Sequence, residues 1–120
     1  MKNNILKISY KVLLIVISTL FIFVGVEKIL IRPDMVKSFE TFGLPKEFMV
    51  IIGFTELVLG VMLQTKYFTK IASNGLISIL SFATLFHIMN NQYLMSLVPV
   101  LIIMTLLVTL NLGQKVKNIS

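Results

Sequence analysis

The sequence predicts an all-α integral membrane protein: a four-helix antiparallel bundle with a short amphipathic helix between its first and second helices. The composition is the first reason, because apolar residues make up 57% of the chain and charged residues 13%, against roughly 45–50% and 25% in soluble domains. A soluble chain of this size could not bury so much hydrocarbon. The second reason is a series of four long apolar stretches, and the third is an uneven distribution of basic residues between their connections. We therefore treat residues 1–120 as a single four-helix domain.

The four apolar stretches lie at residues 12–31, 48–64, 71–89 and 94–112. A helix needs about 20 mostly apolar residues to cross the hydrocarbon layer. The backbone must satisfy its own hydrogen bonds in lipid, and these stretches lack the alternation of a membrane β-barrel, so we expect helices. The fourth stretch contains Pro99, which is expected to kink it.

Basic residues predict the orientation of the bundle. Three segments contain bases and no acid, and their bases are Lys2, Lys7, Lys11, Lys66, Lys70, Lys115 and Lys117. Positively charged connections stay in the cytoplasm, so both termini are expected there. The net charge of +6 is thereby explained by membrane orientation and by attraction to anionic lipid headgroups. The expected partner is therefore the lipid bilayer, and no nucleic acid is expected.

The longest connection, between the first two apolar stretches, contains a helical pattern. Apolar side chains recur at i, i+1, i+4 and i+7 from Met35 to Phe42, with Pro33 at the start and Gly43 just past the end. Proline inside the first turn and glycine after the last are start and stop signals of a helix. We predict a short amphipathic helix over residues 33–42, lying on the outer membrane face or capping the bundle. An ordered loop with some apolar contacts is the alternative.

Glu56 lies about 12 Å inside the second apolar stretch at 1.5 Å per residue. A carboxylate at this depth is costly, so we expect it to face the bundle interior and to find a partner or stay protonated. Gly53 and Gly60 share its helix face, and small residues on one face allow a close approach of another helix. The sequence therefore predicts a buried contact face with an acid at its centre. It leaves open whether Glu56 binds a ligand or proton, or pairs with a base to fix the packing.

Lys28 and His87 are the other candidate site residues. Lys28 lies near the outer end of the first stretch, shares a helix face with Gly25, and is the expected partner of Glu56, directly or through water. Alternatively, the Lys28 side chain does not pair with Glu56 and extends to the outer membrane interface. His87 lies near the outer end of the third stretch, where it could donate to a polar headgroup, carry a proton, or simply bond a neighbour. With one histidine and no cysteine, the chain is not expected to hold a metal or haem, and thiol chemistry is excluded for it.

Four motifs together resemble the DoxX-like family of small four-helix bacterial membrane proteins. They are Gly25-x-x-Lys28, Phe39-x-x-Phe42-Gly43-Leu44-Pro45, Gly53-x-x-Glu56-Leu57-x-x-Gly60 and His87. The resemblance covers roughly residues 12–89, and the fourth apolar stretch matches only in hydropathy. It implies a bundle in the bacterial cytoplasmic (inner) membrane, with Lys28, Glu56 and His87 as its polar cluster. It does not imply one activity, because relatives include a quinone oxidoreductase subunit, a cofactor-maturation protein and a receptor-assembly chaperone.

Two classes of function follow from this resemblance. In the first, the chain is a redox-associated membrane subunit that holds a quinone or other lipid-like ligand against Lys28, Glu56 and His87 in the outer leaflet, with a soluble or membrane redox protein as its partner. In the second, it is a non-catalytic membrane anchor or assembly partner, and the cluster only holds the helices together. No nucleophile–base pair or phosphate-binding loop is visible in the sequence, so a stand-alone enzyme is not expected.

Overall fold

The computed structural model describes residues 1–119, and every secondary-structure element in that range is a helix. The five helices are α1 (Lys2–Ile29), α2 (Pro33–Thr41), α3 (Lys46–Met62), α4 (Thr69–Met89) and α5 (Tyr93–Ile119). The all-helical prediction is thus confirmed. The short amphipathic helix is also present as α2, and Phe42 follows it as the C-terminal cap residue.

Three of the helices, α1, α4 and α5, are long and apolar enough to cross a membrane. Much of their apolar surface points outward: Phe23, Phe82 and Leu101, for example, are each at least 60% exposed. Such a surface requires lipid rather than water around it. The chain is therefore a multi-pass membrane protein. The 17 residues of α3 reach about 26 Å, slightly less than the hydrocarbon thickness of about 30 Å.

Two helices extend well beyond the apolar stretches that predicted them. The first helix begins at Lys2 rather than near residue 12, and the last continues to Ile119 rather than ending near residue 112. Hydropathy detects only the part of a helix that lies in hydrocarbon, whereas lysine and glutamine continue a helix readily in water. At its other end α1 ends at Ile29, because Ile31 has a positive φ of 57° and Pro33 keeps the residue before it extended. The last helix runs through Pro99 without interruption.

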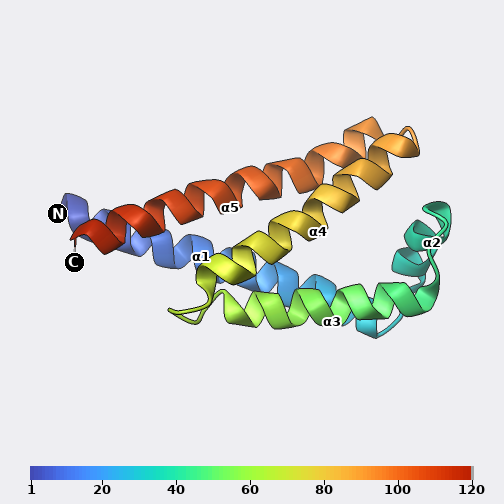
Figure 1. The fold of residues 1–120 in the computed structure, drawn as a ribbon, viewed down its shortest axis with the longest axis horizontal. Coiled ribbons are helices and arrows are strands. Elements are labelled where there is room, and N and C mark those ends of the chain that lie inside the picture. Colours follow the sequence, from blue (N-terminus) through green and yellow to red (C-terminus); the bar gives the residue numbers. More distant parts are fainter. Residues whose placement is uncertain (120) are drawn as a thin grey trace.

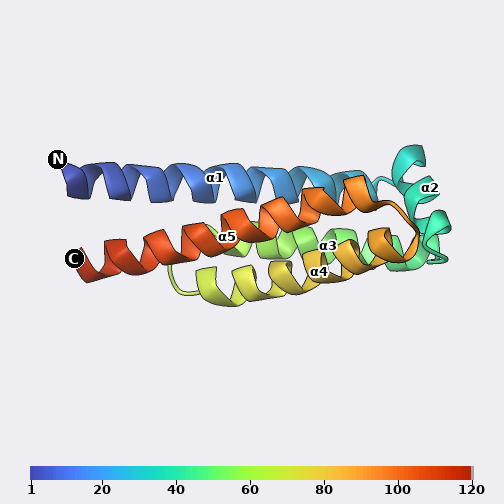
Figure 2. The same ribbon diagram turned by 90° about the horizontal axis from the view of Figure 1, so that it is seen from above.

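The long helices are arranged as two neighbouring pairs. Helix α1 packs mainly against α3, and α4 packs mainly against α5, while contacts of α1 with α5 and of α3 with α4 join the pairs. Consecutive long helices run in opposite directions, so both chain ends lie at one end of the molecule (Figure 1). Helix α2 lies at the other end, close to the connection between α4 and α5 (Figure 2).

The apolar core lies toward the end of the molecule that carries the chain termini. Its members come from α1, from the residue after α3, from α4 and from α5, and include Phe21, Leu63, Leu76 and Leu106. Toward the α2 end, the α4–α5 pair diverges from α1 and α3 (Figure 1). The polar candidate residues therefore lie outside the main core, near α2.

Candidate functional site

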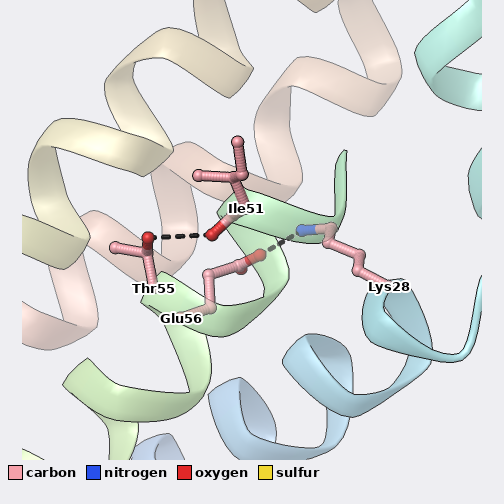
Figure 3. Close-up of polar contacts among 4 residues, drawn as sticks. All are labelled: Lys28, Ile51, Thr55 and Glu56. Atoms are coloured by element: carbon pink, nitrogen blue, oxygen red, sulfur yellow. Dashed lines mark hydrogen bonds and ion pairs between the residues drawn. The ribbon is translucent and has the colours of Figure 1, made fainter. Parts of the chain in front are cut away.

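Lys28 and Glu56 form a buried ion pair between α1 and α3 (Figure 3). The lysine Nζ donates a hydrogen bond to Oε1 of the glutamate, and the two side chains are only 12% and 4% exposed. The neighbouring Thr55 takes no part, since its hydroxyl donates to the carbonyl of Ile51 at 2.9 Å (Figure 3). Charges inside a membrane protein are expected to pair in this manner. The direct contact predicted between the two helices is present.

Glycines bring the two backbones close enough for this pair to form. A Cβ atom added to Gly25 would lie 2.6 Å from the carbonyl oxygen of Gly53. A Cβ atom added to Gly53 would lie 2.8 Å from both the Gly25 oxygen and the Cβ of Lys28. Farther along α3, a Cβ on Gly60 would lie 3.2 Å from Cγ1 of Ile22. All three glycines of the predicted packing set therefore lie in the contact between α1 and α3.

A second polar contact joins the same helices at the opposite end of their interface. The Gln64 side chain follows α3 and donates from Nε2 to Oγ of Ser18 at 2.7 Å and to the carbonyl of Leu14 at 3.0 Å. Ser18 and Lys28 are about 15 Å apart along α1 at 1.5 Å per residue. Polar contacts at both ends of this segment thus set the register of α1 against α3.

The ring of Phe39 in α2 lies over the lysine of the ion pair. Nζ of Lys28 lies 5.9 Å from the ring centroid of Phe39, within the range of a cation–π contact. Phe39 in turn lies 6.4 Å from Phe42, between ring centroids. Phe42 stacks on Phe86 of α4 at 5.5 Å and meets the ring of His87 edge-on at 5.1 Å. A continuous row of rings therefore connects the ion pair to the end of α4 and holds α2 across this end of the molecule.

His87 lies apart from the ion pair. Its Nδ1 is 2.7 Å from Oε1 of Gln92 in the connection between α4 and α5. No hydrogen bond or ion pair within residues 1–119 joins it to Lys28 or Glu56. The structure thus brings two of the three predicted cluster residues into contact and links the third to them only through the aromatic rings of α2.

A pocket of about 260 Å³ opens beside His87, between α2 and the α4–α5 connection. Polar side chains from Asp34, Lys37, Ser38, Thr41 and Gln92 line it together with His87 and Met95. Lys28 and Glu56 are not among the lining residues. Among the residues that the structure describes, no group of three histidine, cysteine or acidic side chains could hold a metal ion.

The contact between Ser18 and Gln64 was not predicted, although the sequence contains a signal for it. Gln64 lies four residues after Gly60 on the face that carries Glu56, and Ser18 lies seven residues before Gly25 on the face that carries Lys28. Extending the stripe of α3 by one turn and that of α1 by two turns would have found both residues. A capping position for the short helix was one of its two predicted placements. Its individual contacts, of Phe39 with Lys28 and of Phe42 with Phe86 and His87, were not predicted, because the helical pattern of α2 does not indicate which helices it meets.

Comparison with known families gave a match over most of the chain. The model of the DoxX-like family matches residues 12–110, which include Lys28, Glu56 and His87. The chain belongs to the DoxX-like family. This match extends into α5, which the sequence motifs had related to the family only by hydropathy. Searches among curated proteins and among solved structures gave no match.

Proposed function

We propose that this DoxX-like chain is a non-catalytic membrane subunit, an anchor or assembly partner, in which Lys28 and Glu56 hold α1 and α3 together. The proposal rests on the observation that Lys28 and Glu56 are paired with each other and enclosed by neighbouring residues. Each charge has the other as its partner, glycine backbones are in contact on one side, and Phe39 lies over the lysine on the other. A ligand headgroup would have to separate the two helices before reaching either charge. Buried polar groups of this kind can specify how helices pair.

The proposed subunit crosses the bacterial cytoplasmic membrane four times as an antiparallel bundle, with both termini in the cytoplasm. Helix α3 would be the short span, and local thinning of the bilayer accommodates a deficit of a few ångströms at modest cost. The lysine-rich connections at the end with the termini support this orientation. Cysteines introduced at Lys66 and Asn91 should label from opposite sides of sealed cells, and labelling from the same side would overturn the topology.

The anchor proposal is tested by removing both charges together. A Lys28→Met/Glu56→Met variant should remain folded in detergent, and a ubiquinone analogue should bind it no better and no worse than the parent. The matched control is Glu40→Gln, which removes an exposed charge from α2 and should also leave binding unchanged. If the parent binds the analogue and only the folded double variant loses it, the pair is a ligand site and the anchor proposal fails.

The second candidate is a redox-associated subunit that binds a quinone or other lipid-like ligand, with a redox protein as its partner. The polar pocket beside His87 favours it, because His87, Gln92 and Lys37 could hydrogen-bond the oxygens of a headgroup there. The tail would then follow the apolar helix faces. Quinone titration of folded Lys28→Ala, Glu56→Gln and His87→Ala variants tests it. Loss of binding in His87→Ala alone would support the pocket, whereas unchanged binding in all three would exclude the cluster.

A further inference from the structure

A second cavity, of about 440 Å³, lies at the opposite end of the molecule, near the chain termini. It is bounded by α1, by the turn between α3 and α4, and by α5. Its α1 wall comes from Lys7, Tyr10, Lys11, Leu14 and Ile15, which recur at helical spacing and so share one face of the helix. Near the cavity, α1 and α5 extend past the turn between α3 and α4 (Figure 2).

The cavity is basic, and none of its lining residues within the described range 1–119 is acidic. Lys7 and Lys11 line it from α1 and Lys66 lines it from the turn. The ion pairs found within residues 1–119 join other residues, so these three lysines have no carboxylate partner there. Their charge is therefore available to an anion from outside the chain.

The inner part of the same cavity is apolar. Leu14, Ile15 and Leu63 line it, next to the point where the charged beginning of α1 passes into its hydrophobic stretch. A basic mouth above an apolar floor at this depth matches a phospholipid, whose phosphate lies at the membrane surface and whose acyl chains lie below it. A small soluble anion would contact only the lysines and would leave the apolar part of the cavity unfilled.

Fixed contacts hold the walls in place. The ring of Tyr10 lies so close to Gly113 of α5 that a Cβ atom added to the glycine would be 2.8 Å from Cε1. In the turn, the hydroxyl of Thr69 donates to the carbonyls of Leu63 at 3.1 Å and Thr65 at 2.8 Å. These contacts fix the positions of Tyr10 and of the turn on either side of the cavity.

We propose that this cavity binds an anionic phospholipid, with its phosphate headgroup among Lys7, Lys11 and Lys66 and an acyl chain along Leu14 and Ile15. Basic pockets between membrane helices are a known physical solution for holding anionic headgroups. The proposal is independent of the function of the ion pair between α1 and α3. The orientation of the chain decides only which leaflet supplies the lipid.

Native mass spectrometry of the purified full chain tests the proposal. The probes are phosphatidylglycerol and phosphatidylcholine with identical acyl chains, so that only the headgroup charge differs. The parent should bind phosphatidylglycerol at least tenfold more tightly. In the Lys7→Gln/Lys11→Gln/Lys66→Gln variant this preference should fall to near unity, because each lysine near an anionic headgroup contributes about fivefold in affinity.

The matched control is Lys70→Gln/Lys115→Gln/Lys117→Gln, which removes the same charge from the same end of the molecule without touching the cavity lining. It should keep the parent's preference within about twofold, as expected when contacts at close range dominate over the screened field of distant charges. Equal losses in both triple variants, or no headgroup preference in the parent, would overturn the proposal. So would displacement of the lipid by millimolar glycerol phosphate, since the site would then recognise a free phosphate group. Thermal unfolding in phosphatidylcholine alone should be the same for all three proteins, which shows that the variants are folded.

Discussion

Substituting Lys28 with methionine keeps an unbranched side chain one atom shorter, removes the charge, and leaves Glu56 without its partner. The carboxylate is only 4% exposed and lies in the middle of α3, so it cannot reach water. Removing one member of a buried ion pair typically costs about 3–5 kcal/mol, because the other charge remains buried and uncompensated. We expect the Lys28→Met variant to lose about this much free energy of unfolding.

The structure predicts a smaller loss in free energy of unfolding when Glu56 is replaced instead of Lys28. In Glu56→Gln the remaining charge belongs to Lys28, whose side chain is 12% exposed and lies in the last turn of α1. Its long stem can carry the ammonium group to the outer interface. The reference is Arg32→Met, which removes a weak surface contact to Glu27, at 3.9 Å with the arginine side chain 57% exposed. Such surface pairs contribute about 0–1 kcal/mol.

Reversible unfolding by SDS titration in mixed micelles measures all of these variants under the same conditions. Lys28→Met should be the least stable, Glu56→Gln intermediate and Arg32→Met close to the parent. The double variant Lys28→Met/Glu56→Met should regain most of the loss, since apolar residues of similar volume often replace a buried pair without penalty. The reasoning is refuted if Lys28→Met costs no more than Arg32→Met, or if the double variant is less stable than Lys28→Met alone.

Three further substitutions test other contacts between the helices. Gly25→Ala should cost about 1–3 kcal/mol in the same titration, because its Cβ would meet the backbone of α3, whereas Gly75→Ala meets only the flexible end of a leucine side chain and should cost clearly less. Gln64→Leu should cost about 0.5–1.5 kcal/mol by removing two hydrogen bonds between α1 and α3, and an unchanged unfolding midpoint would contradict their role in setting the register. Phe42→Ala should increase amide hydrogen exchange in α2 by freeing it from α4, and unchanged exchange there would mean that other contacts hold this helix.

Much of the candidate site could be predicted from the sequence because it depends on geometry within single helices. A turn of about 100° per residue puts Gly53, Glu56 and Gly60 on one face of a helix, wherever that helix is placed. The cost of a charge in lipid then requires a basic partner, and Lys28 was the base at a suitable depth. The separation of His87 from the ion pair could not be predicted by this reasoning. Its position along α4 does not determine how α4 packs against α2.

The sequence by itself determined that the chain is helical, that it lies in a membrane, and that the segments at one end of the bundle contain bases but no acid. These properties follow from hydropathy and from backbone hydrogen bonding, which act locally along the chain. Only the tertiary structure decided that α1 pairs with α3, that α2 folds over Lys28, and that α1, α5 and the turn between α3 and α4 form a basic cavity. Those features depend on which helix faces meet, and the contacts involved join residues far apart in the sequence, such as Ser18 and Gln64.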